Sequence, residues 1–340
     1  MKKTTAFFLS VAIICMIIGG IGSATFFRRA EQSMTKQTMK TYDIKDKKNT
    51  KEIHLNLSGN ADFYILTESS NKVVMNTRSS KPISIESSLD VKEKNDQLTI
   101  SANSNRKKME LDGLKFDIFD RGSAVNLTIP DTVERLIIDG KSSGDIHLSN
   151  VTTKKIDVAM NNADVNANTI NTEKLTIETQ NGDIHVKNDI RADEATFKTA
   201  NGDIQINNFT SSDWSVYSSS GDISLYTVKG TSKIETVNGD IEANNLKGDV
   251  SVKSVNGQFS LSGTDMPKKL SVESQQGDIQ LNTEEILYDV SIKTKTTLGD
   301  STIFGKERSS YKKGKEKKSF ELKSNSGDIS VDGPSDGDDD

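Results

Sequence analysis

The sequence predicts an all-β fold, a single-stranded parallel β-solenoid with coils of about 19–20 residues, preceded by one N-terminal transmembrane helix. Three observations predict the solenoid. A tripeptide recurs at nearly constant spacing, apolar residues alternate around it, and turn residues separate the apolar pairs. A sustained period near twenty residues is typical of solenoids, in which each coil packs only against its neighbours.

The repeated tripeptide is Gly-Asp-Ile. Degenerate copies begin at Ala163, Gly257 and Gly299, and successive copies are separated by 19, 19, 20, 19, 18, 18, 20, 22 and 28 residues. Because equivalent residues stack in a solenoid, the aspartates are expected to line one edge, and Asp300 joins them from a degenerate copy. We interpret the residues of the seven full copies as structural repeat turns: Gly144, Asp145, Gly182, Asp183, Gly202, Asp203, Gly221, Asp222, Gly239, Asp240, Gly277, Asp278, Gly327 and Asp328.

Apolar residues occupy fixed positions relative to each repeat glycine. Around Gly182 they are Leu175 and Ile177 before the turn, and Ile184 and Val186 after it. A spacing of two is typical of a strand with one buried face. A fifth apolar residue often follows seven positions after the glycine, at Val151, Ile170, Phe209, Val228 and Leu246. Each coil is therefore expected to contribute three short inward-facing segments.

Asn-Gly-Asp and Ser-Gly-Asp turns, as at Asn181 and Ser220, connect these segments. They are expected to supply the positive φ that Gly and Asn adopt at low cost. Asn-Gly between alternating apolar runs also fits a β-hairpin, so a meander of hairpins and a propeller with short blades remain alternatives. Propeller blades usually need about 40 residues, and hairpins would leave the fifth inward position unexplained, so the solenoid is favoured.

The chain divides into five predicted segments. They are a signal anchor or transmembrane helix at residues 1–29, a polar stalk at 30–50, irregular first coils and a cap at 51–140, the Gly-Asp-Ile solenoid at 141–332 with a basic insertion at 305–319, and a disordered acidic tail at 333–340. The apolar run between about Phe7 and Phe27 is long enough to cross a bilayer, which takes about 20 residues.

Three interpretations of the N-terminus compete: an uncleaved anchor, a secretory signal cleaved near Ala24, and a lipoprotein signal at Cys15. The anchor is favoured, since bulky Ile14 precedes the cysteine. Basic residues after the apolar run favour a cytoplasmic C-terminus by the positive-inside rule. Long domains translocate largely regardless of such charges, and a body without cysteine suits an oxidising exterior. The expected location is therefore the cell membrane, single-pass, with an extracellular C-terminal domain.

Composition excludes several functions. The chain has 44 basic and 49 acidic residues, and five aspartates fall in residues 332–340, so the remaining body is neutral and lacks the basic excess of a nucleic-acid binder. The only cysteine, Cys15, lies in the apolar run, which excludes a disulfide framework, a zinc knuckle and a cysteine nucleophile elsewhere. No catalytic triad, zinc-protease helix, P-loop or dinucleotide fingerprint is present. We therefore assign no catalytic, cofactor or metal site and expect no enzymatic activity.

The aspartate row allows two interpretations. Each carboxylate can accept hydrogen bonds from turn amides, or the row can form weak Ca²⁺ sites, because Ca²⁺ prefers oxygen ligands. The nonapeptide pattern of Ca²⁺-binding β-rolls is absent, so the amide interpretation is favoured and no cofactor is assigned.

The insertion at 305–319 is strongly basic. It is either a solvated hairpin tip or a contact for an anionic wall polymer or lipid headgroups. Nucleic acid is disfavoured there, since only Tyr311 could stack on a base. The candidate contact residues are Lys306, Arg308, Lys312, Lys313, Lys315, Lys317 and Lys318.

The pattern T-x-x-G-D-I-x-Φ, in which Φ is an apolar residue, is seen from Thr199 to Ile206 and from Thr236 to Ala243. It resembles the repeat of the bacterial β-strand-repeat family of candidate adhesins. Within that family the chain resembles the LiaG-like membrane-anchored proteins of Gram-positive envelope-stress operons. The resemblance extends from about Lys51 to Asp332. It implies a right-handed β-helix-like domain, a membrane anchor and no catalytic residue.

Three functions are weighed on this basis. The leading hypothesis is a non-enzymatic, membrane-anchored envelope protein that presents a solenoid surface for binding or adhesion. Its partners would be the membrane, through the N-terminal helix, and a cell-wall polymer or another envelope protein. The alternatives are an accessory component of envelope-stress signalling and a polysaccharide-processing β-helix enzyme. The last requires clustered acidic and basic residues in a cleft across neighbouring coils.

Overall fold

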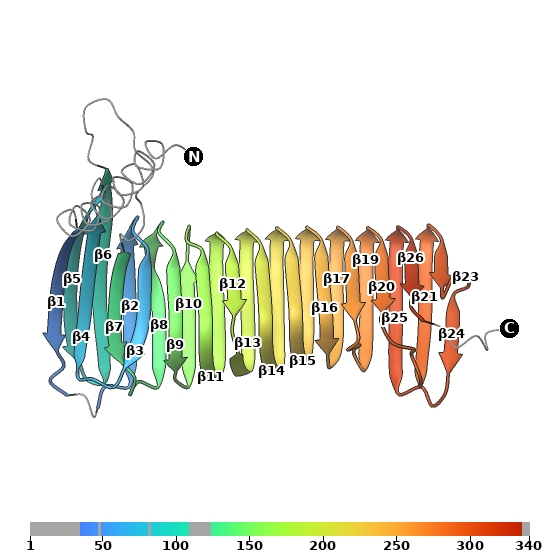
Figure 1. Ribbon diagram of the computed structural model, residues 1–340, viewed down its shortest axis with the longest axis horizontal. Helices are drawn as coiled ribbons and strands as arrows, with labels where there is room; N and C mark the ends of the chain where they lie inside the picture. The colour runs from blue at the N-terminus through green and yellow to red at the C-terminus, as the bar shows by residue number, and fades with distance from the viewer. Residues whose placement is uncertain (1–34, 47–48, 81–82, 109–123, 335–340) are drawn as a thin grey trace, which may run out of the picture.

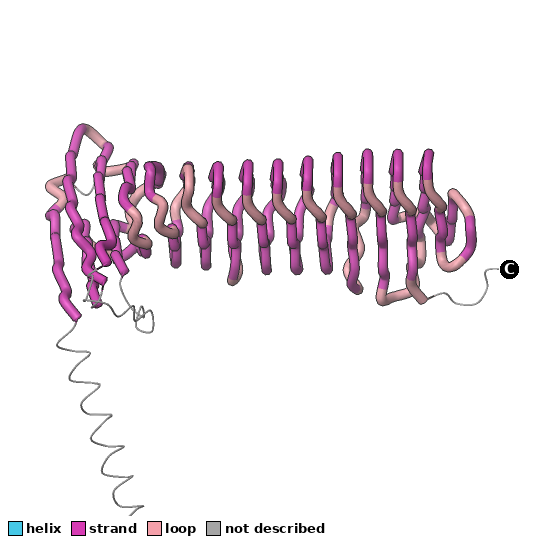
Figure 2. The backbone as a smooth tube through the Cα atoms, turned by 90° about the horizontal axis from the view of Figure 1, so that it is seen from above, coloured by secondary structure: helices cyan, strands magenta, loops and turns pink. Residues whose placement is uncertain are grey.

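The computed structural model describes residues 35–46, 49–80, 83–108 and 124–334, which form an elongated rod of stacked coils (Figure 1). Figure 2 shows the coils lying like rungs along the long axis. The described part of the chain contains no helix able to span a membrane. The predicted anchor at 1–29 lies outside the described residues, and its assignment stays a prediction.

All the secondary structure described is β. The strands, in chain order, are β1 Thr35–Asp43, β2 Glu52–Gly59, β3 Phe63–Glu68, β4 Lys72–Ser80, β5 Ile83–Lys94, β6 Gln97–Lys108, β7 Ala124–Pro130, β8 Arg135–Ser142, β9 Ile146–Thr152, β10 Lys155–Met160, β11 Val165–Asn181, β12 Ile184–Lys187 and β13 Ile190–Asn201. They continue with β14 Ile204–Ser220, β15 Ile223–Asn238, β16 Ile241–Lys247, β17 Asp249–Asn256, β18 Phe259–Gly263, β19 Lys269–Gln276, β20 Ile279–Thr283, β21 Val290–Leu298, β22 Ser301–Ile303, β23 Lys306–Glu307, β24 Ser310–Lys313, β25 Lys318–Ser326 and β26 Ile329–Asp332.

The interior coils pair in parallel and in register, which confirms the predicted solenoid. Between β14 and β15, Ile204 lies opposite Ile223, Phe209 opposite Val228, and Val216 opposite Ile234. These three pairs come from three separate segments of one coil. All the predicted inward residues around Gly182 and at the fifth position are buried, with at most 1% of their surface exposed. The rod therefore has one continuous apolar core along its axis.

The repeat glycines are required mainly by close approach between coils. A Cβ on Gly202 would lie 2.2 Å from the carbonyl oxygen of Gly182, and one on Gly221 would lie 2.0 Å from that of Gly202. Real Cβ atoms do not come this near to a backbone oxygen. The predicted positive φ at the repeat glycine is found in some coils, as at Gly239 (φ 157°) and Gly327 (φ 149°), but not at Gly202 or Gly221. In these coils left-handed φ falls six residues after the glycine, as at Asn208 (φ 54°) and Thr227 (φ 57°).

A column of buried hydroxyls accompanies the glycines. Thr199 Oγ1 donates to the carbonyl oxygen of Gly182 at 3.0 Å, and Ser218 Oγ donates to that of Gly202 at 3.2 Å. A buried carbonyl without a partner is costly, so a small hydroxyl-bearing residue is favoured at this position. This accounts for the Ser or Thr three residues before Gly202 and Gly221, whereas the hydroxyls of Thr236 and Ser274, at the same position before Gly239 and Gly277, have no hydrogen-bond partner.

The N-terminal end of the rod is closed by antiparallel strands. β1 pairs with β4, β4 with β7, and β5 with β6. The predicted stalk at 30–50 is therefore wrong for residues 35–43, which form β1. Its side chains are largely exposed while Tyr42 packs against the core, and an edge strand tolerates such a polar composition.

The array of coils also begins earlier than residue 141. Ala61-Asp62-Phe63 occupies a repeat corner, because Phe63 lies opposite Ile146 in parallel register and Asp145 N–H donates to Asp62 Oδ1 at 3.1 Å. The next corner along the rod, at Gly144, follows in sequence only after β4 to β8. Because of this long intervening segment, the copy at Ala61-Asp62-Phe63 does not fit the regular spacing of the later copies.

The C-terminal coils do not follow chain order. Strand β25 lies between β19 and β21, so that Phe320 is opposite Leu270 on one side and Ile292 on the other. Likewise β26 lies between β20 and β22. The last coil in sequence is therefore inserted before the preceding one, and β21 and β22 form the final coil of the rod.

Candidate functional site: the basic C-terminal cap

The insertion after β22 closes the C-terminal end of the rod. We call residues 288–318 the C-terminal cap. Within it β23 pairs antiparallel with β22, and β24 pairs antiparallel with β21. Both short strands lie at the far right of Figure 1, beyond the last full coil. The insertion thus contains a short β22–β23 hairpin that turns at Phe304 and Gly305, and a strand, β24, that folds back on β21.

Aromatic contacts hold the two halves of the cap together. The rings of Phe304 and Tyr311 meet edge to face with centroids 4.9 Å apart. The Arg308 guanidinium lies 4.6 Å from the centre of the Tyr311 ring, and its Nε donates to the carbonyl oxygen of Ile303 at 3.0 Å. Arg308 therefore has a structural role in addition to its charge.

A carboxylate anchors the return of the chain into β25. Lys317 Nζ lies 2.8 Å from Asp289 Oδ2, and the Lys315 N–H donates to Asp289 Oδ1 at 2.7 Å. The hydrogen bond from Lys317, followed by that from the Lys315 backbone, holds the pKa of Asp289 below its ordinary value. Lys312 makes a second internal pair, with Nζ 3.0 Å from Glu316 Oε1. With Arg308, three of the seven predicted cations thus stabilise the cap.

Cations nevertheless outnumber anions in the cap. Residues 288–318 contain nine Lys and Arg against four Asp and Glu, a formal charge of +5 in a chain whose total is −5. Large apolar side chains add to this surface, since Tyr288 is 60% and Leu298 is 70% exposed. Lys313 Nζ lies 5.4 Å from the centre of the Tyr288 ring. Such a surface suits a polyanion that also offers apolar groups.

The structure brings the predicted contact residues to one end of the rod. Lys306 is in β23, Arg308 follows it, Lys312 and Lys313 are in β24, and Lys318 begins β25. Lys315 and Lys317 lie in the turn between β24 and β25. What the sequence did not indicate is the contribution of β21, whose exposed Lys293 and Lys295 join the same end. The sequence does not mark these two lysines as part of the basic surface, because they precede the insertion and occupy the outward positions of an ordinary strand.

The aspartate row is a column of hydrogen bonds. Asp203 Oδ1 accepts the backbone N–H of Asp222 at 2.8 Å, and Asp222 Oδ1 accepts that of Asp240 at 2.8 Å. The predicted role as turn-amide acceptors is confirmed for these residues. Among the residues the structure describes, no group of three or more His, Cys, Asp or Glu is placed to hold a metal ion.

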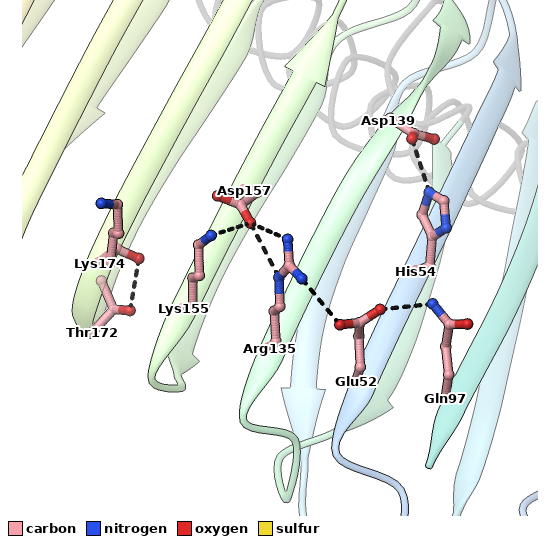
Figure 3. Close-up of polar contacts among 9 residues, drawn as sticks. All are labelled: Glu52, His54, Gln97, Arg135, Asp139, Lys155, Asp157, Thr172 and Lys174. Atoms are coloured by element: carbon pink, nitrogen blue, oxygen red, sulfur yellow. Dashed lines mark hydrogen bonds and ion pairs between the residues drawn. The ribbon is translucent and has the colours of Figure 1, made fainter. Parts of the chain in front are cut away.

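On the first coils, in contrast, opposite charges meet across neighbouring strands (Figure 3). Arg135 bridges Glu52 at 3.3 Å and Asp157 at 3.0 Å, and Lys155 Nζ lies 3.1 Å from the same Asp157 carboxylate. His54 Nε2 lies 2.8 Å from Asp139 Oδ2. This face is therefore neutralised by its own side chains, and it does not share the charge excess of the cap.

A second polar cluster lies at the first Gly-Asp corners. Tyr64 and His147 stack with ring centroids 4.2 Å apart, and Arg106 Nη2 lies 2.5 Å from Asp62 Oδ2. Burial lowers the pKa of His147, whereas burial together with the neighbouring Asp62 and Asp164 carboxylates raises the pKa of Asp145. The sequence did not indicate this cluster, because Tyr64 and His147 are far apart in the chain.

One shallow depression of about 360 Å³ lies on β15, β17, β19 and β25. Its rim includes the ion pair between Lys269 and Asp249, at 3.1 Å, together with Glu321. Small side chains such as Ser251 and Ser271 form its lining. It is open and lacks the convergent polar groups that fix a small ligand.

The chain is similar to a candidate adhesin from Bacteroides fragilis (17% identity, 73% of this chain and 97% of that chain, TM-score 0.42). It is also similar to a candidate adhesin (12%, 87% and 97%, TM-score 0.45) and a candidate lipid-binding protein (11%, 87% and 97%, TM-score 0.42), both from Parabacteroides distasonis. No curated protein matches. The Toastrack DUF4097 family model matches residues 50–230 and 173–332, and the chain belongs to this family.

Proposed function

We propose that the protein is a non-enzymatic, membrane-anchored envelope protein that binds an anionic polymer through its C-terminal cap. One observation carries the proposal: the described chain begins at one end of the rod, at β1, and the basic cap closes the other end (Figure 1). About ten strand spacings of ~4.8 Å separate Asp62 from Asp300, a distance of about 48 Å. A chain anchored before β1 therefore carries the cap away from its anchor.

This distance favours a polymer over the bilayer in which the protein is anchored. Attraction between exposed charges is largely screened beyond about 8–10 Å at physiological salt. An upright rod would hold the cap several such lengths above the headgroups. A polymer that extends outward from the membrane would still reach it, and spaced phosphates or carboxylates would match spaced lysines.

The surface features of the cap also favour binding over catalysis. Its cations are distributed over β21, β23, β24 and the connecting turns, and two of them are held by carboxylates of the cap itself. A dispersed basic surface binds polyanions with little demand on geometry, whereas catalysis requires groups converging on one reacting atom. The resemblance to LiaG-like proteins is consistent with this location at the envelope.

The binding test uses the full-length protein in phosphatidylcholine nanodiscs, with inorganic polyphosphate as the probe. Replacement of Lys306, Lys312 and Lys315 by Gln should weaken binding about tenfold at low salt and reduce its salt dependence. The matched control replaces Lys187, Lys198 and Lys229, three exposed lysines of the interior coils, and should change affinity less than twofold. Equal losses in the two variants would show that the cap is not a specific site.

The choice between polymer and lipid is tested with vesicles of phosphatidylglycerol and phosphatidylcholine. The proposal expects cap-dependent binding of polyphosphate, with vesicle binding weak at physiological salt. Vesicle binding that is tighter and equally dependent on the cap lysines would assign the cap to a lipid surface instead.

Anchoring and location are tested on cells. Protease added to intact cells should remove the rod and leave a membrane-bound fragment. Protection of the rod would place it on the cytoplasmic side. The accessory role in envelope-stress signalling predicts a different outcome, in which deletion changes a stress reporter while polymer binding by envelopes is unaltered.

A further inference from the structure

The end of the chain leaves the rod directly beside the C-terminal cap. Val331 in β26 lies opposite Ile303 in β22, and Ile303 lies opposite Lys306 in β23. The Phe304 N–H donates to the Val331 carbonyl oxygen at 2.8 Å. Two strand spacings of ~4.8 Å therefore separate the end of β26 from Lys306, about 10 Å in all.

The sequence that follows has the charge that the cap lacks. Residues 332–340 contain five aspartates and no cation, against a formal charge of +5 over residues 288–318. Residues 335–340 lie outside the described chain, and six residues span at most about 20 Å when extended. That reach covers the distance from β26 to β23.

The cap already binds carboxylates of its own. Lys317 pairs with Asp289, and Lys312 pairs with Glu316. Lysine ammonium groups on this surface can therefore form ion pairs with aspartate carboxylates. A tethered segment experiences an effective concentration in the millimolar range, far above that of a free peptide. Individual exposed ion pairs are weak, but several aspartates on one short segment act together.

We infer that the acidic C-terminal segment, residues 332–340, docks on the C-terminal cap of its own chain and competes there with polyanions. This inference rests on the proposed function, because it concerns regulation of the same surface. An intramolecular competitor sets a threshold: short or sparsely charged anions fail to displace the segment, whereas a long polyanion with many contacts does. The occupant is a segment of this chain that leaves the rod at β26, beside the cap.

The test compares four forms of the full-length protein: the native chain, a chain ending at Pro334, a chain with Asp336, Asp338, Asp339 and Asp340 replaced by Asn, and a chain with residues 335–340 moved to directly before Thr35. The moved segment keeps the net charge but lies at the opposite end of the rod. Binding of inorganic polyphosphate is measured at low and high salt. Zero-length carbodiimide coupling followed by mass spectrometry identifies carboxylates in contact with lysines.

The inference expects truncation, Asn replacement and relocation each to tighten polyphosphate binding about three- to tenfold at low salt, with the difference lost at high salt. Coupling in the native chain should join the C-terminal aspartates to cap lysines, independently of protein concentration. If the relocated chain binds like the native chain, the effect is one of net charge and the inference fails. Absence of coupling to the cap, or coupling only between chains, would also overturn it.

Failure of the inference and failure of the proposed function give different results. If the Lys-to-Gln variant of the cap binds polyphosphate normally even in the truncated chain, the proposed function fails, whatever the coupling shows. If that variant loses binding while all four C-terminal forms bind alike, the cap is a polyanion site and only the docking of the segment is refuted.

Discussion

The interior coils and the C-terminal cap differ in strand pairing, burial and charge. In the interior, each coil forms parallel backbone pairs and buries its apolar residues, and its hydroxyl and aspartate columns bond the next coil. In the cap, the antiparallel strands β23 and β24 have only 2 and 4 residues, and cations dominate. Most of the stabilising contacts therefore lie in the coils, and the cap carries an excess of positive charge.

The two ends of the rod show the same division. The N-terminal end is closed by strands of 9 to 12 residues, and ion pairs such as Glu52–Arg135 neutralise the neighbouring face. The C-terminal end is closed by much shorter strands and retains its charge. Both ends cover an open sheet edge, but only one offers a surface suited to a charged partner.

The largest difference between the two regions should appear when an aromatic side chain is removed. Trp214 is 4% exposed and lies in register between Ala195 and Ser232, whose small side chains make room for the indole. Trp214→Ala should lower the free energy of unfolding by about 3–5 kcal/mol, because the coil cannot collapse into the space. Tyr311→Ala in the cap should cost about 1–2 kcal/mol, since that ring is partly exposed. Urea unfolding measures both, and equal losses would contradict the division.

Glycine substitutions test the same difference between coils and cap through the backbone. A Cβ at Gly202 would lie 2.2 Å from the Gly182 oxygen, whereas a Cβ at Gly305 in the cap would have no atom within 4 Å. Gly202→Ala should therefore destabilise the protein by about 2–3 kcal/mol through overpacking. Gly305→Ala should cost about 1 kcal/mol, because only the left-handed φ of +70° opposes it. Thermal unfolding followed by circular dichroism gives the ranking, which a larger loss at Gly305 would reverse.

The aspartate column allows the same substitution to be compared in an interior coil, at Asp203, and in the terminal coil, at Asp300. Asp203→Ala removes the acceptor of the Asp222 N–H and should cost about 1–2 kcal/mol, whereas Asp203→Asn keeps an acceptor oxygen and should cost less. Asp300→Ala, in the terminal row, should cost under about 0.5 kcal/mol, because no further coil donates to that carboxylate within the described chain. Chemical denaturation measures the series. A shift of the unfolding midpoint on adding or chelating Ca²⁺ would support metal sites in the row instead.

The smallest effect concerns the Asp289 carboxylate in the cap. Its hydrogen bonds from Lys317 and from the Lys315 backbone lower its pKa in the folded state. The stability that they contribute is therefore present above the ordinary carboxyl pKa and is lost as the pH falls through the lowered folded value. Lys317→Gln should move the pKa of Asp289 toward its ordinary value, as followed by NMR titration of the carboxyl carbon. An unchanged titration would mean that the Lys317 contact does not persist in solution.

Much of the fold could be predicted because one local pattern is repeated. The period, the alternation of Leu175 and Ile177, and the small residues at each corner all report the same coil, so their agreement identified the solenoid and its buried positions. The position of left-handed φ could not be read this way. At Thr227 a β-branched residue adopts it, which local preference alone would not predict. Packing between coils determines that corner.

Only part of the candidate site could be predicted from the sequence. A run of lysines after β22 is visible in the chain, and the structure places these residues at one end of the rod. Its form as a cap depends on the pairing of β24 with β21, a contact between strands that no local pattern specifies. The contribution of Lys293 and Lys295 follows only once the order of the last coils in space is known.

That order has a consequence for how the protein is made. Because β25 and β26 occupy the gap between β19–β20 and β21–β22, the final two coils cannot be completed while the last residues are still inside the ribosome. If the rod grows from its N-terminal side during synthesis, growth is expected to pause at β20 until β26 has emerged. A message truncated before Lys318 would yield a rod with an exposed edge at β19 and a detached β21–β24 segment. The exposed edge of such a product would be a template for aggregation.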